Sequence, residues 1–126
     1  MEGTILLVED ERAQRILYKI ELEDEGYTVF VAANSAEALE IVKKNAPDLA
    51  ILDIALAGED GLELMGRILK LDDSIPIILH TAYGVWEDNW RGMVADDYVV
   101  KSSDLSKIKA SVKKTLRKSK LDVRDS

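Results

Sequence analysis

Five polar side chains of this 126-residue chain stand at or directly after the ends of short apolar runs. They are three acids, a threonine and a lysine: Glu9, Asp10, Asp53, Thr81 and Lys101. Three carboxylates that lie close together repel one another unless a cation is bound among them. Oxygen ligands without histidine or cysteine suit a hard ion, and Mg²⁺ more than zinc. The chemistry of this set, once it is brought together, is that of a magnesium site.

Asp53 is the best candidate for a nucleophile in this set. A carboxylate can attack phosphorus and form an acyl phosphate. Such a transfer depends mainly on cations around the phosphoryl oxygens and on in-line positioning, which Mg²⁺, Lys101 and the Thr81 hydroxyl would supply. Residues 54–61 form a loop of small residues after Asp53, so backbone N–H groups can approach a phosphoryl group there. The residues therefore predict phosphoryl transfer to Asp53.

The elements that must position these residues alternate between strand and helix. Apolar runs that are typical of strands buried on both faces of a parallel sheet occur at residues 5–8, 29–32, 49–52, 75–79 and 98–100. Helical spacing of apolar residues occurs between them, at 13–20, 38–42, 62–69 and 105–116, and more weakly at 85–93. We expect Ser35 to cap the second helix, and Ser103 or Asp104 to cap the last one.

This alternation predicts an α/β fold with a doubly wound, five-stranded parallel sheet and right-handed crossovers. In such a sheet the carboxyl ends of all strands lie at one edge, where ligands bind. An acid at a strand end is usually only a turn or cap residue. The joint placement of polar residues at four strand ends favours a site instead, and we expect them to converge at that edge.

Composition restricts the class of protein. Hydrophobic residues make up 47% of the chain and charged residues 33%, which suits one compact domain and not a disordered chain. The absence of cysteine excludes disulfides and thiolate metal sites. Because there is neither a signal-peptide pattern nor an apolar run of about 20 residues, we expect a cytoplasmic protein without a membrane span. The net charge of −7 argues against nucleic-acid binding by this domain.

Basic residues outnumber acids among residues 104–126. The plain interpretation is a solvated helix face, and the alternatives are a subunit contact or the start of a linker. We expect residues 1–120 to form the domain and residues 121–126 to be a charged tail or a linker stub.

Four stretches of the sequence resemble the receiver domains of bacterial two-component response regulators, the CheY-like superfamily. They are Ile-Leu-Leu-Val-Glu-Asp-Glu at 5–11, the stretch around Asp53 at 52–64, His-Thr-Ala-Tyr-Gly at 80–84, and Ala-Asp-Asp-Tyr-Val-Val-Lys at 95–101. The resemblance extends over nearly the whole chain. It implies a flavodoxin-like, three-layer (βα)5 fold with strand order 2-1-3-4-5, and a signalling switch rather than an enzyme.

The resemblance also implies roles at the site. Asp53 is similar to the phosphoacceptor, and Asp10 to the direct ligand of Mg²⁺ or Mn²⁺. Glu9 would act on the metal through water, and the backbone carbonyl of Ala55 would be a further ligand beside Asp53. The family pattern places Ala55 and Tyr83 next to the water that would hydrolyse the phosphoryl group. Neither is an obvious base, so we expect slow self-dephosphorylation.

The same resemblance describes a switch and its partners. Lys101 would pair with the phosphoryl group, and Thr81 would hydrogen-bond it and move on activation, followed by the ring of Tyr98. The donor would be a phosphohistidine of a sensor histidine kinase or of a histidine phosphotransfer protein. The output would be a change in the face made by the fourth helix, the fifth strand and the last helix, which is also a candidate homodimer surface. Trp86 and Trp90 lie within the weak helical pattern. Two interpretations of this pair stay open: one tryptophan fills the core while the other lies on the surface, or both belong to that face.

The first helix has more apolar residues than the sheet needs. We expect Leu17, Tyr18 and Leu22 to face the sheet, while Ile16 and Ile20 project to another side of the helix. Those two are either scattered surface residues or a docking patch for the kinase, since receiver domains resemble one another in using this helix there.

Three departures from the family pattern leave the site residues intact. Lys101 is followed by Ser102, where the family usually has proline. We expect a trans bond there, because a cis peptide bond without proline costs about 2.5–4 kcal/mol. Ala57 also replaces a usual proline, and the segment between Thr81 and Lys101 is slightly shorter than in the family.

Three other classes of protein are alternatives to this interpretation. A phosphatase or dehalogenase with an aspartate nucleophile resembles a pattern with a second aspartate two residues later, where this chain has Ala55. A flavodoxin-like electron carrier needs a phosphate loop after the first strand, where Glu9, Asp10 and Glu11 would repel a phosphate. An inactive pseudo-receiver, serving only as a protein-binding module, is disfavoured by the complete set of site residues.

Overall fold

The computed structural model describes residues 3–56, 58–82 and 95–125 of the chain. Its main sheet has five parallel strands in the order β2-β1-β3-β6-β7. In chain order these are β1 (Thr4–Val8), β2 (Thr28–Ala32), β3 (Leu49–Leu52), β6 (Ile77–Thr81) and β7 (Asp97–Val100). The predicted fold class and strand order are confirmed, since β6 and β7 are the fourth and fifth strands of this sheet.

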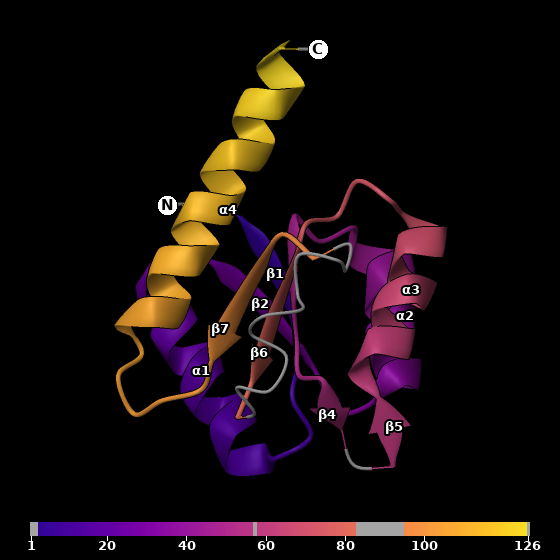
Figure 1. Ribbon diagram of the computed structural model, residues 1–126, viewed down its shortest axis with the longest axis vertical. Helices are drawn as coiled ribbons and strands as arrows, with labels where there is room; N and C mark the ends of the chain where they lie inside the picture. The colour runs from indigo at the N-terminus through magenta and orange to yellow at the C-terminus, as the bar shows by residue number, and fades with distance from the viewer. Residues whose placement is uncertain (1–2, 57, 83–94, 126) are drawn as a thin grey trace.

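Four helices within the described ranges cover the two faces of the sheet. They are α1 (Arg12–Asp24), α2 (Ser35–Asn45), α3 (Gly61–Leu71) and α4 (Ser106–Asp125). Helices α1 and α4 lie on one face and α2 and α3 on the other, which gives three layers (Figure 1). The helix expected at 85–93 falls outside the described residues, together with Ala57, Tyr83, Trp86 and Trp90.

Each face of the sheet has its own hydrophobic core, because successive side chains of a strand point to opposite faces. In β1, Leu6 and Val8 pack with the residues of α2 and α3, whereas Ile5 and Leu7 pack with those of α1 and α4. All residues of β3 and β6 are buried, as expected for central strands of a parallel sheet. The continuous apolar runs thus fix the sheet and, with it, the edge at which its strands end.

One predicted strand boundary needs correction. Strand β6 begins at Ile77, two residues later than the apolar run at 75–79 suggested, and continues through His80 to Thr81. Pro76 precedes the strand and has no N–H group to donate to a sheet. The run is therefore buried from its start, but the strand begins only after the proline.

The helix caps were predicted to within one residue. The cap of α2 is Asn34 and not Ser35, because the Asn34 side chain accepts a hydrogen bond of 3.0 Å from the backbone N–H of Glu37. Ser35 is instead the first residue of the helix. At the start of α4, Asp104 is the predicted cap residue, since its Oδ1 accepts a hydrogen bond of 3.0 Å from the N–H of Ser106.

Helix α1 presents a different face to the sheet than expected. Tyr18 and Leu22 are buried, as predicted. Leu17 was expected beside them and is 44% exposed, like Ile16 at 47% and Ile20 at 52%. The prediction for Leu17 was wrong because residues 17 and 18 point about 100° apart on a helix, and the buried line follows Tyr18. The apolar stripe that first indicated this helix therefore faces outward.

The segment after β3 contains a small hairpin that the sequence did not predict. Two-residue strands, β4 (Ala55–Leu56) and β5 (Glu59–Asp60), pair antiparallel within the expected loop. Gly58, between them, has a φ of 69°, a left-handed conformation that glycine adopts without steric cost. Strands this short leave no periodicity in a sequence.

Three further expectations concern the backbone. The peptide bond between Lys101 and Ser102 is trans, as predicted, and no described peptide bond is cis. Helix α4 continues to Asp125, through residues that were expected as a tail. Among the described ranges, no helix is both long and apolar enough to cross a membrane.

Candidate functional site

Strand register brings the predicted residues together. Val8 pairs with Leu52 at the ends of β1 and β3, so the residues that follow these strands, Glu9 and Asp53, emerge side by side. The backbone N–H of Lys101 donates a 2.7 Å hydrogen bond to the carbonyl of Thr81. The expected convergence at one edge of the sheet is therefore observed.

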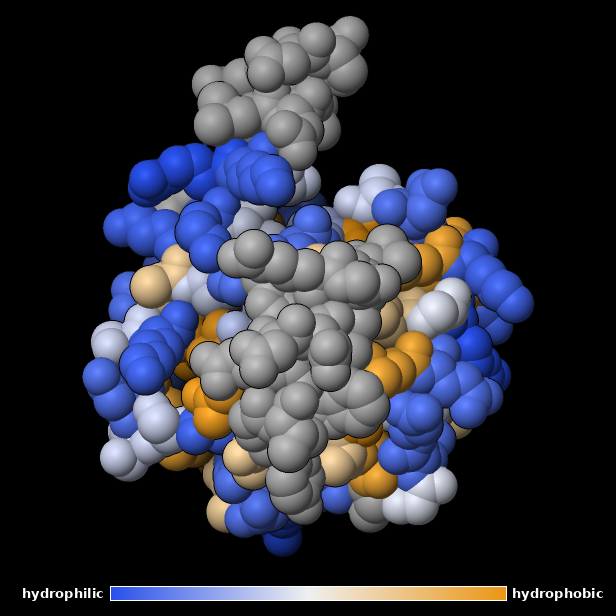
Figure 2. Space-filling model, viewed as in Figure 1, coloured by the Kyte–Doolittle hydropathy of each residue, from blue (hydrophilic) through white to orange (hydrophobic). Residues whose placement is uncertain are grey.

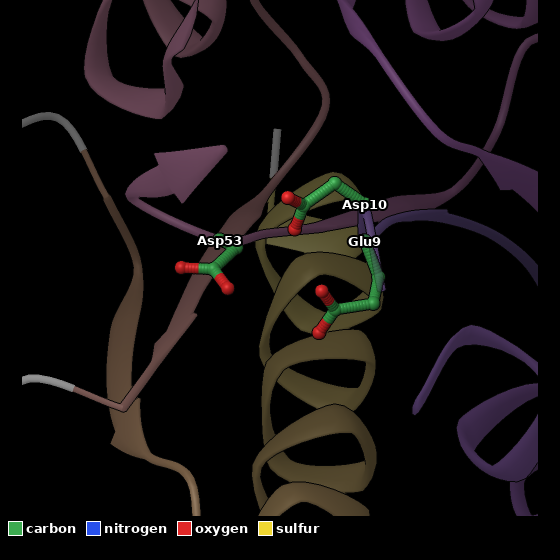
Figure 3. A group of neighbouring side chains, drawn as sticks. All are labelled: Glu9, Asp10 and Asp53. Carbon is green, nitrogen blue, oxygen red and sulfur yellow. The ribbon is translucent and has the colours of Figure 1, made fainter. Parts of the chain in front are cut away.

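Three carboxylates surround one small space at this edge. Glu9, Asp10 and Asp53 each place a carboxylate oxygen within 4.8 Å of the other two. Figure 3 shows Glu9 and Asp10 extending from the end of β1 toward the Asp53 carboxylate. Glu9 is 2% exposed and Asp53 is 6% exposed. Buried carboxylates at this separation require positive charge nearby.

The Lys101 side chain supplies positive charge to this cluster. Its ammonium group pairs with the Glu9 carboxylate and lies 2.6 Å from Asp53 Oδ2. Burial by itself would lower the pKa of Lys101, but the hydrogen bonds and charges of Asp53 and Glu9 outweigh it and raise that pKa above its ordinary value. Burial raises the pKa of the Glu9 carboxyl, against the opposing effect of Lys101.

Gln14 is a site residue that no motif in the sequence indicated. Its Oε1 accepts a hydrogen bond of 2.8 Å from Lys101 Nζ. A polar residue in the first turns of a helix is usually assigned to the solvent-exposed side. The available signal was its spacing, because Gln14 stands four residues before the buried Tyr18 and so shares its helix face.

The loop after β3 approaches the Asp53 backbone very closely. Asp53 Oδ1 accepts a hydrogen bond of 3.0 Å from the N–H of Ala55. A Cβ atom on Gly61 would lie 1.9 Å from the backbone carbonyl oxygen of Asp53. Asp60 caps α3 by accepting a 2.8 Å hydrogen bond from Leu62 N–H. The Asp60-Gly61 pair thus begins helix α3, and at Gly61 only glycine fits against the candidate nucleophile.

The predicted switch residues lie on the two neighbouring strands. Thr81 is fully buried at the end of β6 and pairs in register with Val100. Tyr98, in β7, is partly buried and packs against the core on the α2 and α3 side. The two residues are therefore placed on adjacent strands, as the predicted switch requires.

His80 lies beneath the site on the α1 side of the sheet. It is buried, and its ring centroid is 5.1 Å from that of Tyr18. Burial, together with the charge of Lys101, lowers the pKa of this imidazole to about 4. His80 is therefore neutral at physiological pH and acts in the packing of the strand against α1.

The described site residues carry three carboxylates and one ammonium group, so their formal charges leave two negative charges. One divalent cation would neutralise that remainder. All charged donors are carboxylate oxygens, the ligands that Mg²⁺ prefers. The residues present therefore fit a magnesium ion.

Comparison with known proteins agrees with this geometry. The sequence matches the family described as the response regulator receiver domain over residues 5–113. It is 38% identical over 118 residues to sporulation initiation phosphotransferase F of Bacillus subtilis, and the match covers 92% of this chain and 95% of that protein. It is 36% identical to the uncharacterized transcriptional regulatory protein YkoG of Bacillus subtilis, where the match covers 92% of this chain and 52% of the relative. The chain thus spans about half the length of some of its relatives.

A solved response-regulator structure is also similar to this chain, both in sequence and in fold. The response regulator TrrA of Thermotoga maritima, in complex with Mg²⁺ and BeF, is 43% identical, with a TM-score of 0.82 over 91% of this chain and 99% of that one. The same protein has also been solved in complex with the histidine kinase ThkA. From its sequence, its strand order and its site, the chain belongs to the family of response-regulator receiver domains and is a signalling switch of two-component systems.

Proposed function

We propose that this domain accepts a phosphoryl group on Asp53, in an Mg²⁺-dependent reaction. The observation that carries the proposal is the Lys101 ammonium, 2.6 Å from Asp53 Oδ2, within a cluster of three carboxylates that needs a cation. An Asp53 oxygen would attack phosphorus while the bond from phosphorus to the leaving group breaks. With a phosphohistidine donor, that bond is P–N, and the imidazole leaves with a proton.

The metal would be held by carboxylate and carbonyl oxygens. Asp10, Asp53 and the backbone carbonyl of Ala55 are the proposed direct ligands, and Glu9 would act through water. Mg²⁺ or Mn²⁺ fits this set, and when bound it would neutralise charge on the phosphoryl oxygens. Lys101 would hold a second phosphoryl oxygen and the Thr81 hydroxyl a third.

Thr81 and Tyr98 are the proposed switch. A hydrogen bond from Thr81 to the phosphoryl group would draw this residue toward Asp53, and the Tyr98 ring would turn in behind it. The change would reach the face of β7 and α4, which is also the proposed homodimer surface; the helix predicted at 85–93 as part of this face lies outside the described residues. The described part of α4 offers a hydrophilic surface there (Figure 2), which includes the exposed Lys113 and Lys114.

The outer face of α1 is the proposed docking site for the phosphoryl donor. Ile16, Leu17 and Ile20 are exposed there, beside the acids that follow β1. TrrA of Thermotoga maritima was solved in complex with a histidine kinase, and we propose a sensor histidine kinase or a histidine phosphotransfer protein as the donor here. With such a donor, we propose that the reaction takes place in the cytoplasm.

Loss of the phosphoryl group by self-dephosphorylation should be slow. Ala55, two residues after Asp53, offers no base to activate water. Tyr83 takes the corresponding place after Thr81, and its side chain would screen water from the phosphoryl group. A lifetime of the phosphorylated protein that lengthens when Tyr83 is replaced by a smaller residue would contradict a screening role for this side chain.

Acetyl phosphate with Mg²⁺ provides the test of the proposed function. Mass spectrometry should show the mass of one added phosphoryl group on the wild type and on the control Asp24→Asn, which alters an exposed carboxylate at the far end of α1. Asp53→Asn should show none. Phosphoryl uptake by Asp53→Asn at the wild-type rate would mean that another residue is the acceptor.

A further inference from the structure

The Lys101 ammonium is held from three sides. An ammonium group has three N–H donors, and three acceptors lie around Nζ: the Glu9 carboxylate, Asp53 Oδ2 at 2.6 Å and Gln14 Oε1 at 2.8 Å. The Lys101 side chain is only 11% exposed. Two of the acceptors are carboxylates of the metal cluster, and Gln14 is the neutral one.

Helix geometry explains why Gln14 reaches this lysine. Positions 14, 18 and 22 share one face of α1, and Tyr18 and Leu22 are buried against the sheet on that face. Gln14 continues the line at the N-terminal end of the helix, where the face passes the carboxyl edge of the sheet. It is partly buried there.

The turn that carries Gln14 is fixed to the acidic loop. Arg15 Nη1 donates hydrogen bonds of 2.9 Å to the carbonyl of Glu9 and 3.3 Å to the carbonyl of Asp10. The backbone that carries Gln14 is therefore tied to the loop that carries two of the carboxylates.

We propose that Gln14 is a positioning residue that holds the Lys101 ammonium in place during phosphoryl transfer, a role that rests on the proposed function of Asp53. When a phosphoryl group and a divalent ion arrive, the Glu9 and Asp53 carboxylates acquire new partners. The neutral amide oxygen of Gln14 continues to accept the hydrogen bond from Lys101 through that change. A lysine tethered in this way loses less rotamer freedom on pairing with the phosphoryl oxygen.

Gln14→Leu removes the acceptor while keeping an apolar side chain of similar bulk, and Gln14→Met is a second variant with an unbranched chain like that of glutamine. Both should be phosphorylated by acetyl phosphate about tenfold more slowly than the wild type, the usual effect of losing a hydrogen bond to a charged group. Affinity for Mg²⁺, measured by calorimetry, should stay within about twofold, because no proposed ligand has been removed. The control Lys19→Leu changes a side chain of the same helix that is 41% exposed, and it should behave as wild type in both assays.

A double-mutant cycle identifies the route by which Gln14 acts. In a Lys101→Met background, Gln14→Leu should slow phosphorylation by less than about twofold, because the group it positions is gone. A crystal structure of the wild type with Mg²⁺ and beryllofluoride should keep the hydrogen bond between Gln14 and Lys101.

The proposal would be overturned by wild-type rates in both Gln14 variants, by an equal loss of rate in the Lys101→Met background, or by a lysine that has left Gln14 in the beryllofluoride complex. A parallel loss of Mg²⁺ affinity and rate would also overturn it, since that would mean general disruption of the site. If the wild type and Lys19→Leu took up no phosphoryl group, the proposed function itself would fail, which is a distinct result from wild-type activity in the Gln14 variants.

Discussion

The buried imidazole of His80 should make the stability of the domain depend on pH in the mildly acidic range. His80 is 4% exposed, and burial with the charge of Lys101 lowers its pKa from 6.5 to about 4. The unfolded chain therefore takes up a proton at a higher pH than the folded chain does. This contribution to stability is fully present above pH 6.5 and is lost as the pH falls toward 4.

The size of the effect follows from the two pKa values. The gap between them corresponds to about 3 kcal/mol of unfolding free energy when the loss is complete, and about 2 kcal/mol of it falls between pH 7 and pH 5. His80 is the only histidine in the chain, so His80→Leu removes the whole contribution. The variant also loses the ring contact with Tyr18, which changes its stability equally at both pH values.

Urea unfolding followed by circular dichroism, with EDTA present, measures the difference. Between pH 7 and pH 5, the wild type should lose about 2 kcal/mol more unfolding free energy than His80→Leu. The raised pKa of Glu9 contributes with the opposite sign in both proteins and cancels from the comparison. Equal losses in the two proteins, or an NMR titration of His80 with a midpoint near 6.5, would refute the reasoning.

Three more predictions use other parts of the molecule. Gly61→Ala should cost at least about 2 kcal/mol of unfolding free energy, because its Cβ would meet a backbone carbonyl oxygen at 1.9 Å. The control Gly66→Ala has open space in the same helix and should not destabilise the domain. Equal urea midpoints for the two variants would contradict this prediction. Ile16→Asp should slow phosphoryl transfer from the kinase but not from acetyl phosphate, while Leu71→Asp, equally exposed on α3, should slow neither; equal slowing from both donors would argue against docking. Beryllofluoride should change the emission of the two tryptophans, and unchanged emission with binding confirmed independently would exclude their part in the switch.

The sheet was predictable from the sequence because burial on both faces imposes a pattern that few other structures share. The runs that became β1, β3 and β6 are apolar at nearly every position, and parallel strands require this. The boundaries were less predictable because they depend on single hydrogen bonds. Strand β6 begins only after Pro76, and the cap of α2 is Asn34 rather than Ser35.

The orientation of α1 was not decided by its sequence. Two lines of residues share this helix: the apolar stripe containing Ile16, Leu17 and Ile20, and the line containing Tyr18 and Leu22. Periodicity indicates that a helix forms, but both lines satisfy it. The second line is buried because Tyr18 meets the ring of His80 on β6, a contact between segments far apart in the chain.

The site residues differ in the same way: some were predictable from the sequence, and others depend on contacts between segments far apart in the chain. A metal-assisted phosphoryl transfer requires particular residue types, so Asp53 and Lys101 could be assigned from type and strand-end position alone. Gln14 and Gly61 are required by their positions in the fold instead. Gln14 must reach Lys101 from a neighbouring helix, and Gly61 must leave room beside the Asp53 carbonyl. Any hydrogen-bond acceptor of suitable length could serve at position 14, and only the absence of a side chain matters at position 61. Requirements of that kind become visible when α1 and the loop after β3 are placed against the strand ends.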